Sequence, residues 1–168
     1  INTGGVYTNL SSYLENYSDD NLIPKFVVNS KAFTEKGDKL FELIAEILNT
    51  SKYDDVDRLK AVLTRQQSRV ESRVKNNGLN YALTRLNSYF TNDGMFDELT
   101  GGLDYYNFLT DLTENFDAKH NEISEKLAQT AKILFTKKNM IAAVTCSNDQ
   151  YDTYTKDLQI LISSLPEG

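Results

Sequence analysis

Two kinds of hydrophobic periodicity follow one another along this chain, and their order restricts the folds that it can adopt. Between residues 6 and 14, apolar and polar side chains alternate with a period of two, which predicts a strand. After a polar connection, residues 25–33 indicate a second strand, opened by Pro24. From Thr34, which has the position of a helix N-cap, apolar residues instead recur three and four positions apart, as on one face of an α-helix.

The helical periodicity continues through several segments that ordinary stop signals separate. Asp54 and Asp55 stand where negative charge favours the positive end of a helix dipole, at the start of a long helix. An apolar, β-rich run at 139–147 predicts a buried strand, and a last helix ends before Pro166. This order predicts an α+β fold: a small, mostly antiparallel sheet with a layer of helices packed on one face.

Composition narrows the class of protein further. A chain of 168 residues, 40% hydrophobic and 25% charged, is typical of one soluble globular domain, here 1–168. The net charge of −6 argues against a nucleic-acid partner, and no run approaches the ~20 apolar residues of a membrane span. The single cysteine suits a reducing compartment, the cytoplasm or an organellar matrix. Because the chain opens at Ile1 and enters a strand-like run at once, we expect a piece of a larger protein.

No group of residues forms a recognisable catalytic or metal-binding motif. His120 is the only histidine, and neither HExxH nor HxxEH occurs. Glu122 and Glu125 are its neighbours, but a zinc site needs three or four converging ligands, so we interpret His120 as a surface residue of a polar helix face. Cys146 lies in the apolar run and is interpreted as a small core residue. We therefore predict no catalytic, cofactor-binding or metal-binding residue in this chain.

Acidic pairs and glycines also have structural explanations. Gly101-Gly102 ahead of Asp104 could suggest a phosphate cradle, but the fuller Gly-rich patterns and their Lys are absent. A helix stop followed by an Asp cap explains the same residues. Two pairs of neighbouring acids are interpreted as loop and cap residues, not as a general acid–base pair: Asp19-Asp20 and Asp54-Asp55.

An arginine stripe on the long helix is the strongest candidate for anion binding. At about 100° per residue, its members fall within roughly 80° of one another, and the apolar stripe is centred about 115° round the helix. Because the arginines flank the buried face, we predict that they pair with acids within the domain or across a domain boundary. The stripe has four members: Arg58, Arg65, Arg69 and Arg73.

Three stretches of the sequence carry a family resemblance. The longest is "NNGLNYALTRLNSYFTNDGMFDELTGGLDYYNFLTDLTENFD" at 76–117, with an aromatic-Ala-x-x-Arg turn, a T-x-x-G break and then "GGLDYYNFL". Residues 30–63 look like two preceding helices, and residues 139–165 look like a closing strand and helix. Together they resemble the presequence protease branch of the insulinase-like (pitrilysin) zinc metallopeptidases, the inverzincins.

The resemblance implies a non-catalytic role within a larger enzyme. Such peptidases have four related α+β domains in two halves that enclose a peptide-degrading chamber, with zinc held by HxxEH and a downstream Glu in the first domain. This chain looks like the third domain without its earliest strands. It would form part of the C-terminal half and chamber wall, and its partners would be the other domains and unfolded peptide. The parent would be a zinc-dependent peptidase, whereas this fragment alone would be inactive.

Two further functions remain open on the sequence alone. A stand-alone α+β interaction module without enzymatic activity would use its helical surface to bind another protein. A nucleic-acid binder would use the arginine stripe, although such a helix usually carries more lysine and has few acids nearby.

Overall fold

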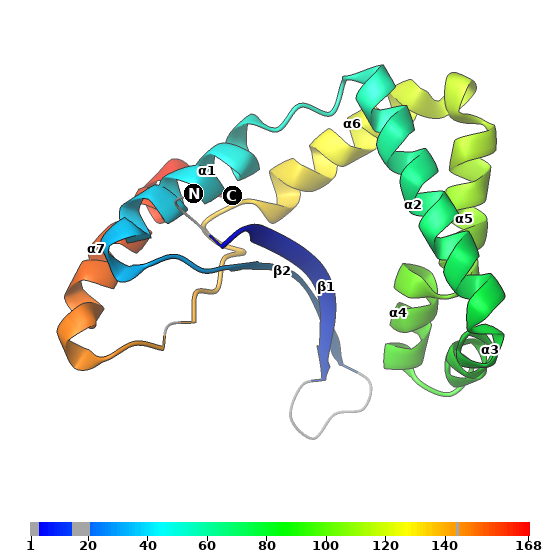
Figure 1. The fold of residues 1–168 in the computed structure, drawn as a ribbon, viewed down its shortest axis with the longest axis horizontal. Helices are drawn as coiled ribbons and strands as arrows, with labels where there is room; N and C mark the ends of the chain where they lie inside the picture. The colour runs from blue at the N-terminus through cyan, green and yellow to red at the C-terminus, as the bar shows by residue number, and fades with distance from the viewer. Residues whose placement is uncertain (1–3, 15–20, 144) are drawn as a thin grey trace. The chain divides into compact units, whose positions relative to one another are not determined.

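The computed structural model describes residues 4–14, 21–143 and 145–168, and it confirms the predicted α+β class (Figure 1). Two strands pair antiparallel in a small sheet: β1 (Val6–Leu14) and β2 (Leu22–Ser30). The helical elements follow in chain order: η1 (Thr34–Lys36), α1 (Gly37–Thr50), α2 (Val56–Asn76), α3 (Gly78–Asn87), α4 (Asn92–Gly101), α5 (Leu103–Glu114), α6 (Phe116–Leu134) and α7 (Asn148–Ser164).

Contacts within the chain divide it into two compact units, and the first unit has a conventional apolar core. It contains residues 1–9, 27–53 and 125–168. Helices α1 and α7 lie side by side in it (Figure 1), and the rings of Phe41 and Tyr154 meet edge to face at 5.4 Å between centroids. Val6 and Val28 of the sheet pack against this core, so the helices cover one sheet face here as predicted. Its buried members are Phe41, Ile44, Ala45, Leu161 and Leu165.

The second unit contains residues 10–26 and 54–124 and is built around packed helices. Helix α2 packs on α5, where Val70 and Leu109 are both buried, and Gln66 donates a hydrogen bond of 3.3 Å to the Tyr105 hydroxyl. Helices α3 and α4 pack on each other, and α4 packs on α5. The expectation that 1–168 form one domain stays a prediction.

Two predicted element boundaries shift for local reasons. Pro24 lies inside β2, which begins at Leu22, because a strand of a two-stranded sheet has a free edge at which the missing N–H of proline is tolerated. Thr34 opens the 3₁₀ turn η1 and makes no side-chain cap. The N–H of Lys36 binds the carbonyl of Phe33 at 2.9 Å, so α1 begins only at Gly37.

The predicted buried strand at 139–147 is wrong, because its described residues are irregular and, apart from the half-buried Met140, exposed. The sheet that the described residues form contains only β1 and β2, so this segment is not part of it. The backbone just before it is hydrogen-bonded elsewhere: the N–H of Lys137 binds the Pro166 carbonyl at 2.9 Å. Ile141 is 75% exposed. Cys146 is exposed as well, so its interpretation as a core residue is also wrong.

Candidate functional site

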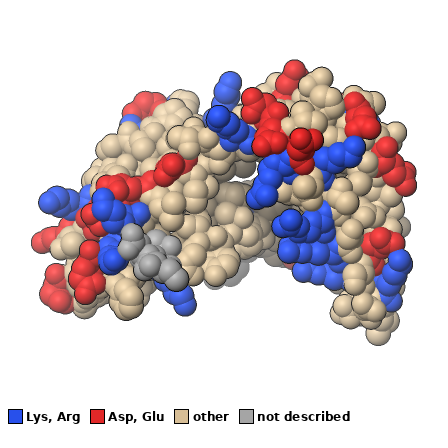
Figure 2. All heavy atoms as spheres, turned by 45° about the horizontal axis from the view of Figure 1, so that its top comes forward, with Lys and Arg blue, Asp and Glu red and all other residues tan. Residues whose placement is uncertain are grey.

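Helix α2 displays its arginines because its start and its buried face fix the rotation of the helix. The Asp55 carboxylate accepts a hydrogen bond of 2.9 Å from the Arg58 N–H, which confirms the predicted acidic cap. Val70 turns towards the interior and is 3% exposed. All four arginines of the stripe (Arg58, Arg65, Arg69 and Arg73) are exposed. Lys and Arg gather on the right-hand, helical part of the view in Figure 2, the part to which α2 belongs.

The arginine stripe has no acidic partner among the described residues. None of its guanidinium groups takes part in any ion pair within 4.0 Å or any side-chain hydrogen bond of the described part of the chain. The predicted pairing within the domain is therefore wrong for these residues, while pairing across a domain boundary stays a prediction. The two acids of α2 lie round the helix from the stripe, and one of them, Glu71, pairs with Lys75 at 2.6 Å.

A different arginine, Arg85, forms ion pairs that the sequence did not predict. Arg85 on α3 donates to both carboxylate oxygens of Asp104, at 2.6 and 3.3 Å, and its Nη2 lies 3.1 Å from Oε1 of Glu98. Glu98 on α4 is fully buried, and its Oε1 also accepts the N–H of Asp104 at 2.9 Å. The hydrogen bond to Asp104, together with the nearby Glu98 charge, raises the pKa of Arg85. We call Arg85, Glu98 and Asp104 the charged triad.

The charged triad corrects the interpretation of the glycine pair. Gly102, and not Asp104, is the N-cap of α5, and the Glu98 side chain satisfies a free N–H of the first turn. A Cβ at Gly102 would collide with the Glu98 carboxylate, so glycine is required for this close approach. The available signal was Arg85 in the aromatic-Ala-x-x-Arg turn, followed by two acids that flank a glycine pair. Sequence spacing alone did not show that they converge.

Helix α3 exposes the apolar face on which an amphipathic helix normally packs. It contains no buried residue. The apolar side chains recur at intervals of three and four residues and therefore form one stripe. Exposure along this α3 apolar face is high: Leu79 75%, Leu83 49% and Leu86 51%; Phe90, in the turn just after the helix, is 75% exposed as well. Exposed apolar patches of this kind mark surfaces that contact another protein surface.

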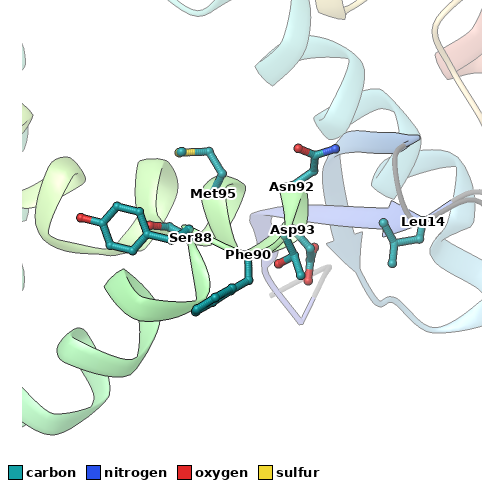
Figure 3. A pocket seen from close by; sticks show the side chains of 8 residues that line it. Leu14, Ser88, Phe90, Asn92, Asp93 and Met95 are labelled. Carbon is teal, nitrogen blue, oxygen red and sulfur yellow. The ribbon is translucent and has the colours of Figure 1, made fainter.

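An open hollow of about 510 Å³ lies in the second unit between α3 and α4 and near the end of β1 (Figure 3). Phe90 and Met95 point to opposite sides of it, while Asp93 accepts a hydrogen bond from Ser12. Burial, together with the Asp93 charge, raises the pKa of Asp97. The hydroxyl of Ser88 donates to the Arg85 carbonyl at 2.7 Å, an ordinary structural hydrogen bond and not one to a general base.

The other residues considered as possible metal ligands or catalytic groups do not come together in one site. His120 is half-buried rather than on the open surface, and its ring lies 5.9 Å from that of Phe116. Glu125 is exposed. Burial, with a contribution from Cys146, raises the pKa of Tyr154. Within the described residues, no three His, Cys, Asp or Glu side chains lie close enough to hold a metal ion.

The two remaining expectations concern the acidic pairs and membrane-spanning segments. The pair Asp19-Asp20 lies outside the described residues. Asp54 is exposed and precedes the Asp55 cap. In the part of the chain that the structure describes, every helix is too short or too polar to cross a membrane.

Comparison with known proteins connects this fold to peptidases. Protein HypA of Clostridium perfringens is 29% identical over 163 residues, which cover 97% of this chain and 16% of that protein. Presequence protease 1, chloroplastic/mitochondrial, of Arabidopsis thaliana is 26% identical over 86% of this chain and 13% of its own length. The mitochondrial presequence protease of Yarrowia lipolytica is 24% identical over 89% of this chain and 15% of its own length.

This chain therefore spans about a sixth, or less, of the length of these relatives. The predicted resemblance to presequence proteases is confirmed by them. A family model described as "Peptidase M-16C associated" matches residues 1–112, which is more than half of the chain. The chain belongs to this peptidase-associated family.

Proposed function

We propose that this chain is a non-catalytic domain of a zinc-dependent, peptide-degrading metallopeptidase, in which it forms part of the C-terminal half and of the chamber wall. The support is twofold: relatives named presequence proteases are matched along most of this chain, and the chain spans only a small part of their length. The parent would act on unfolded peptides in an organellar matrix or in the cytoplasm.

The α3 apolar face is the structural observation that supports the scaffold role. Leu79 near the start of α3 and Phe90 in the turn after it are each 75% exposed, and α3 contains no buried residue, so the helix lacks the burial that normally stabilises an amphipathic segment. Most of the parent polypeptide lies outside this chain, so another domain of the same polypeptide is the natural cover. The chain would then complete its own packing only inside the parent, as a wall element does.

Zinc chemistry would be supplied by another part of the parent. The described residues do not fit a zinc site, since none of them form a group of three His, Cys, Asp or Glu side chains. His120 is turned towards Phe116 instead. No step of peptide cleavage is therefore assigned to a residue of this chain.

The α3 apolar face also favours the alternative function, a stand-alone module that binds another protein. The two functions differ in what the gene encodes upstream of Ile1. The proposed function requires an HxxEH motif in the same reading frame. A complete reading frame that contains only this domain would favour the module.

The structural test uses the complete polypeptide encoded by the gene that carries this sequence. The double variant Leu79→Ser and Leu86→Ser should lower peptide cleavage and the melting temperature of the complete polypeptide. In the 168-residue chain alone, the same changes should leave stability nearly unaltered, because the side chains are already exposed. Ile141→Ser is the control, since Ile141 is as exposed as Leu79, at 75%, but lies outside the α3 apolar face.

Two results would contradict the proposed function. One is stoichiometric, tightly bound zinc in the purified 168-residue chain, measured by elemental analysis. The other is peptide hydrolysis by that chain alone, followed by mass spectrometry of the products.

A further inference from the structure

We propose that the arginine stripe of α2 binds an extended acidic segment of a peptide. This inference rests on the proposed function, because it gives the chamber wall a preference among peptides. It concerns the surface formed by Arg58, Arg65, Arg69 and Arg73, which has no part in the proposed scaffold role.

The stripe is a free cationic surface in an otherwise acidic chain. The chain has a net charge of −6, yet its described carboxylates leave these four guanidinium groups unpaired. Two acids of the same unit have cationic partners elsewhere: Asp104 has Arg85, and Asp117 has Lys60 at 2.8 Å. No described acid pairs with the four guanidinium groups within 4.0 Å, so an incoming carboxylate would meet the stripe without displacing an internal partner.

The spacing of the stripe matches that of an extended peptide. Arg65, Arg69 and Arg73 are each four residues apart, or about 6 Å along the helix axis. In an extended chain, every second side chain points to the same side, at intervals of about 6.6 Å. Three alternate carboxylates thus span about 13 Å, against about 12 Å for the three arginines. Flexible arginine side chains absorb a difference of this size.

The chemistry of the stripe favours carboxylates. A guanidinium group presents a planar fork that binds a carboxylate through two parallel hydrogen bonds, and all four cations are arginine. A nucleic-acid strand carries phosphates at a comparable spacing, but its long backbone would also meet the field of a chain with net charge −6. A short acidic peptide segment avoids most of that repulsion.

The direct test is fluorescence anisotropy of the 168-residue chain with labelled peptides. The probe is a nine-residue peptide in which glutamate alternates with threonine, and the comparison peptide has the same composition with its glutamates contiguous. We expect the alternating peptide to bind more tightly, because only its acids all point to one side. Its binding should weaken as salt increases, since the contacts lie on the surface.

Charge-matched variants locate the binding site. The triple variant Arg65→Gln, Arg69→Gln and Arg73→Gln should raise the Kd for the alternating peptide about tenfold or more. The control removes the same total charge from exposed lysines in the other unit: Lys52→Gln, Lys132→Gln and Lys156→Gln. Both variants should keep the helical circular dichroism signal, because all six side chains are exposed.

Four results would overturn the proposal. They are equal weakening by the two triple variants, equal affinity for the two peptides, tighter binding of a labelled single-stranded oligonucleotide, and binding to the 168-residue chain that the complete polypeptide lacks. The last would mean that an acidic surface of the parent already covers the stripe. Because anisotropy requires no cleavage, a negative result leaves the scaffold role intact. Absence of HxxEH upstream would instead contradict the proposed function without changing the measured affinity.

Discussion

The two units of this chain differ in whether they bury a charge. In the first, Phe41, Ile44 and Leu161 form an apolar core between α1 and α7, and none of its described buried side chains is charged. The second unit also buries apolar side chains, Val70 of α2 among them, but it adds Glu98 of α4, which is fully buried and charged. The apolar side chains of α3 remain exposed. The second unit is thus held in part by specific ion pairs as well as by apolar burial.

This difference suggests that the two units respond differently to small structural changes. Apolar burial is non-directional and stabilises in proportion to area, so a core such as that of α1 and α7 tolerates small shifts. The charged triad requires particular geometry, because a buried carboxylate without its partners is strongly destabilising. In the proposed scaffold role, helices held in one arrangement would help the surface of α3 to fit another domain. Four substitutions test this comparison, from the largest expected effect to the smallest.

The largest effect is expected for Phe41→Ala in the first unit. Removal of a buried aromatic ring, here 5% exposed and packed on Tyr154, should cost about 3–5 kcal/mol of unfolding free energy. Hydrogen exchange should show lost protection in α1 and α7 and retained protection in α2 and α5. Phe33→Ala, at a 75% exposed position, is the control and should have little effect. Equal loss of protection throughout the chain would mean that the two units unfold as one.

The next effect is expected for Arg85→Gln in the second unit. This change leaves the buried Glu98 without its cationic partner, and because Arg85 is itself one-third exposed we expect a loss of unfolding free energy smaller than that of Phe41→Ala. Chemical denaturation measures it. Arg69→Gln is the matched control, with the same change at an exposed arginine that lacks an acidic partner among the described residues. If the two variants were equally stable, the triad would have no special role.

A smaller effect is expected for Gly102→Ala. The added Cβ would meet the Glu98 carboxylate and its Cα at 2.8 Å, so α4 or the first turn of α5 must shift, at a cost of about 1–2 kcal/mol. Gly101→Ala is the control, because a Cβ there meets nothing within 4 Å and alanine favours the helix. Thermal unfolding of both variants should separate them. An unaffected Gly102→Ala variant would argue against the close packing of α4 on α5.

The smallest effect is expected for Lys60→Gln on the dependence of stability on pH. The hydrogen bond from Lys60 lowers the pKa of Asp117 below its ordinary value near 4. A lowered folded-state pKa contributes stability that is present above the ordinary value and is lost as pH falls through the folded one. The variant should therefore lose slightly less stability on acidification than the unmodified chain. Lys52→Gln is the control, and an identical acid profile for both variants would show that the exposed pair contributes nothing measurable.

Local patterns predicted most of the helices because their signals lie within a few residues. The Asp55 cap and the glycine after Asn77 place both ends of α2 within a residue or two, and Pro166 correctly marks the end of α7. The apolar face predicted for α1 contains Phe41 and Ile44, which are buried. In each case backbone hydrogen bonds to near neighbours and one face of the helix determine the outcome.

Contacts between distant residues account for the failures. The run at 139–147 has strand-like residues, but its described part joins neither β1 nor β2 and is irregular. Its position also exposes Cys146. The predicted cap, Asp104, instead pairs with Arg85, nineteen residues earlier. A sequence pattern does not state which distant side chain occupies a given position.

The sequence by itself determined the α+β class, the order of the two strands and the helices, the absence of a recognisable catalytic motif and the resemblance to a peptidase family. These properties follow from local periodicity and from motifs that are contiguous along the chain. Only the tertiary structure decided which arginines are paired: Arg85 is engaged by Glu98 and Asp104, whereas the stripe on α2 is exposed and unpaired among the described residues. Ion pairing depends on distances of a few ångströms between separate elements, and only packing sets those distances.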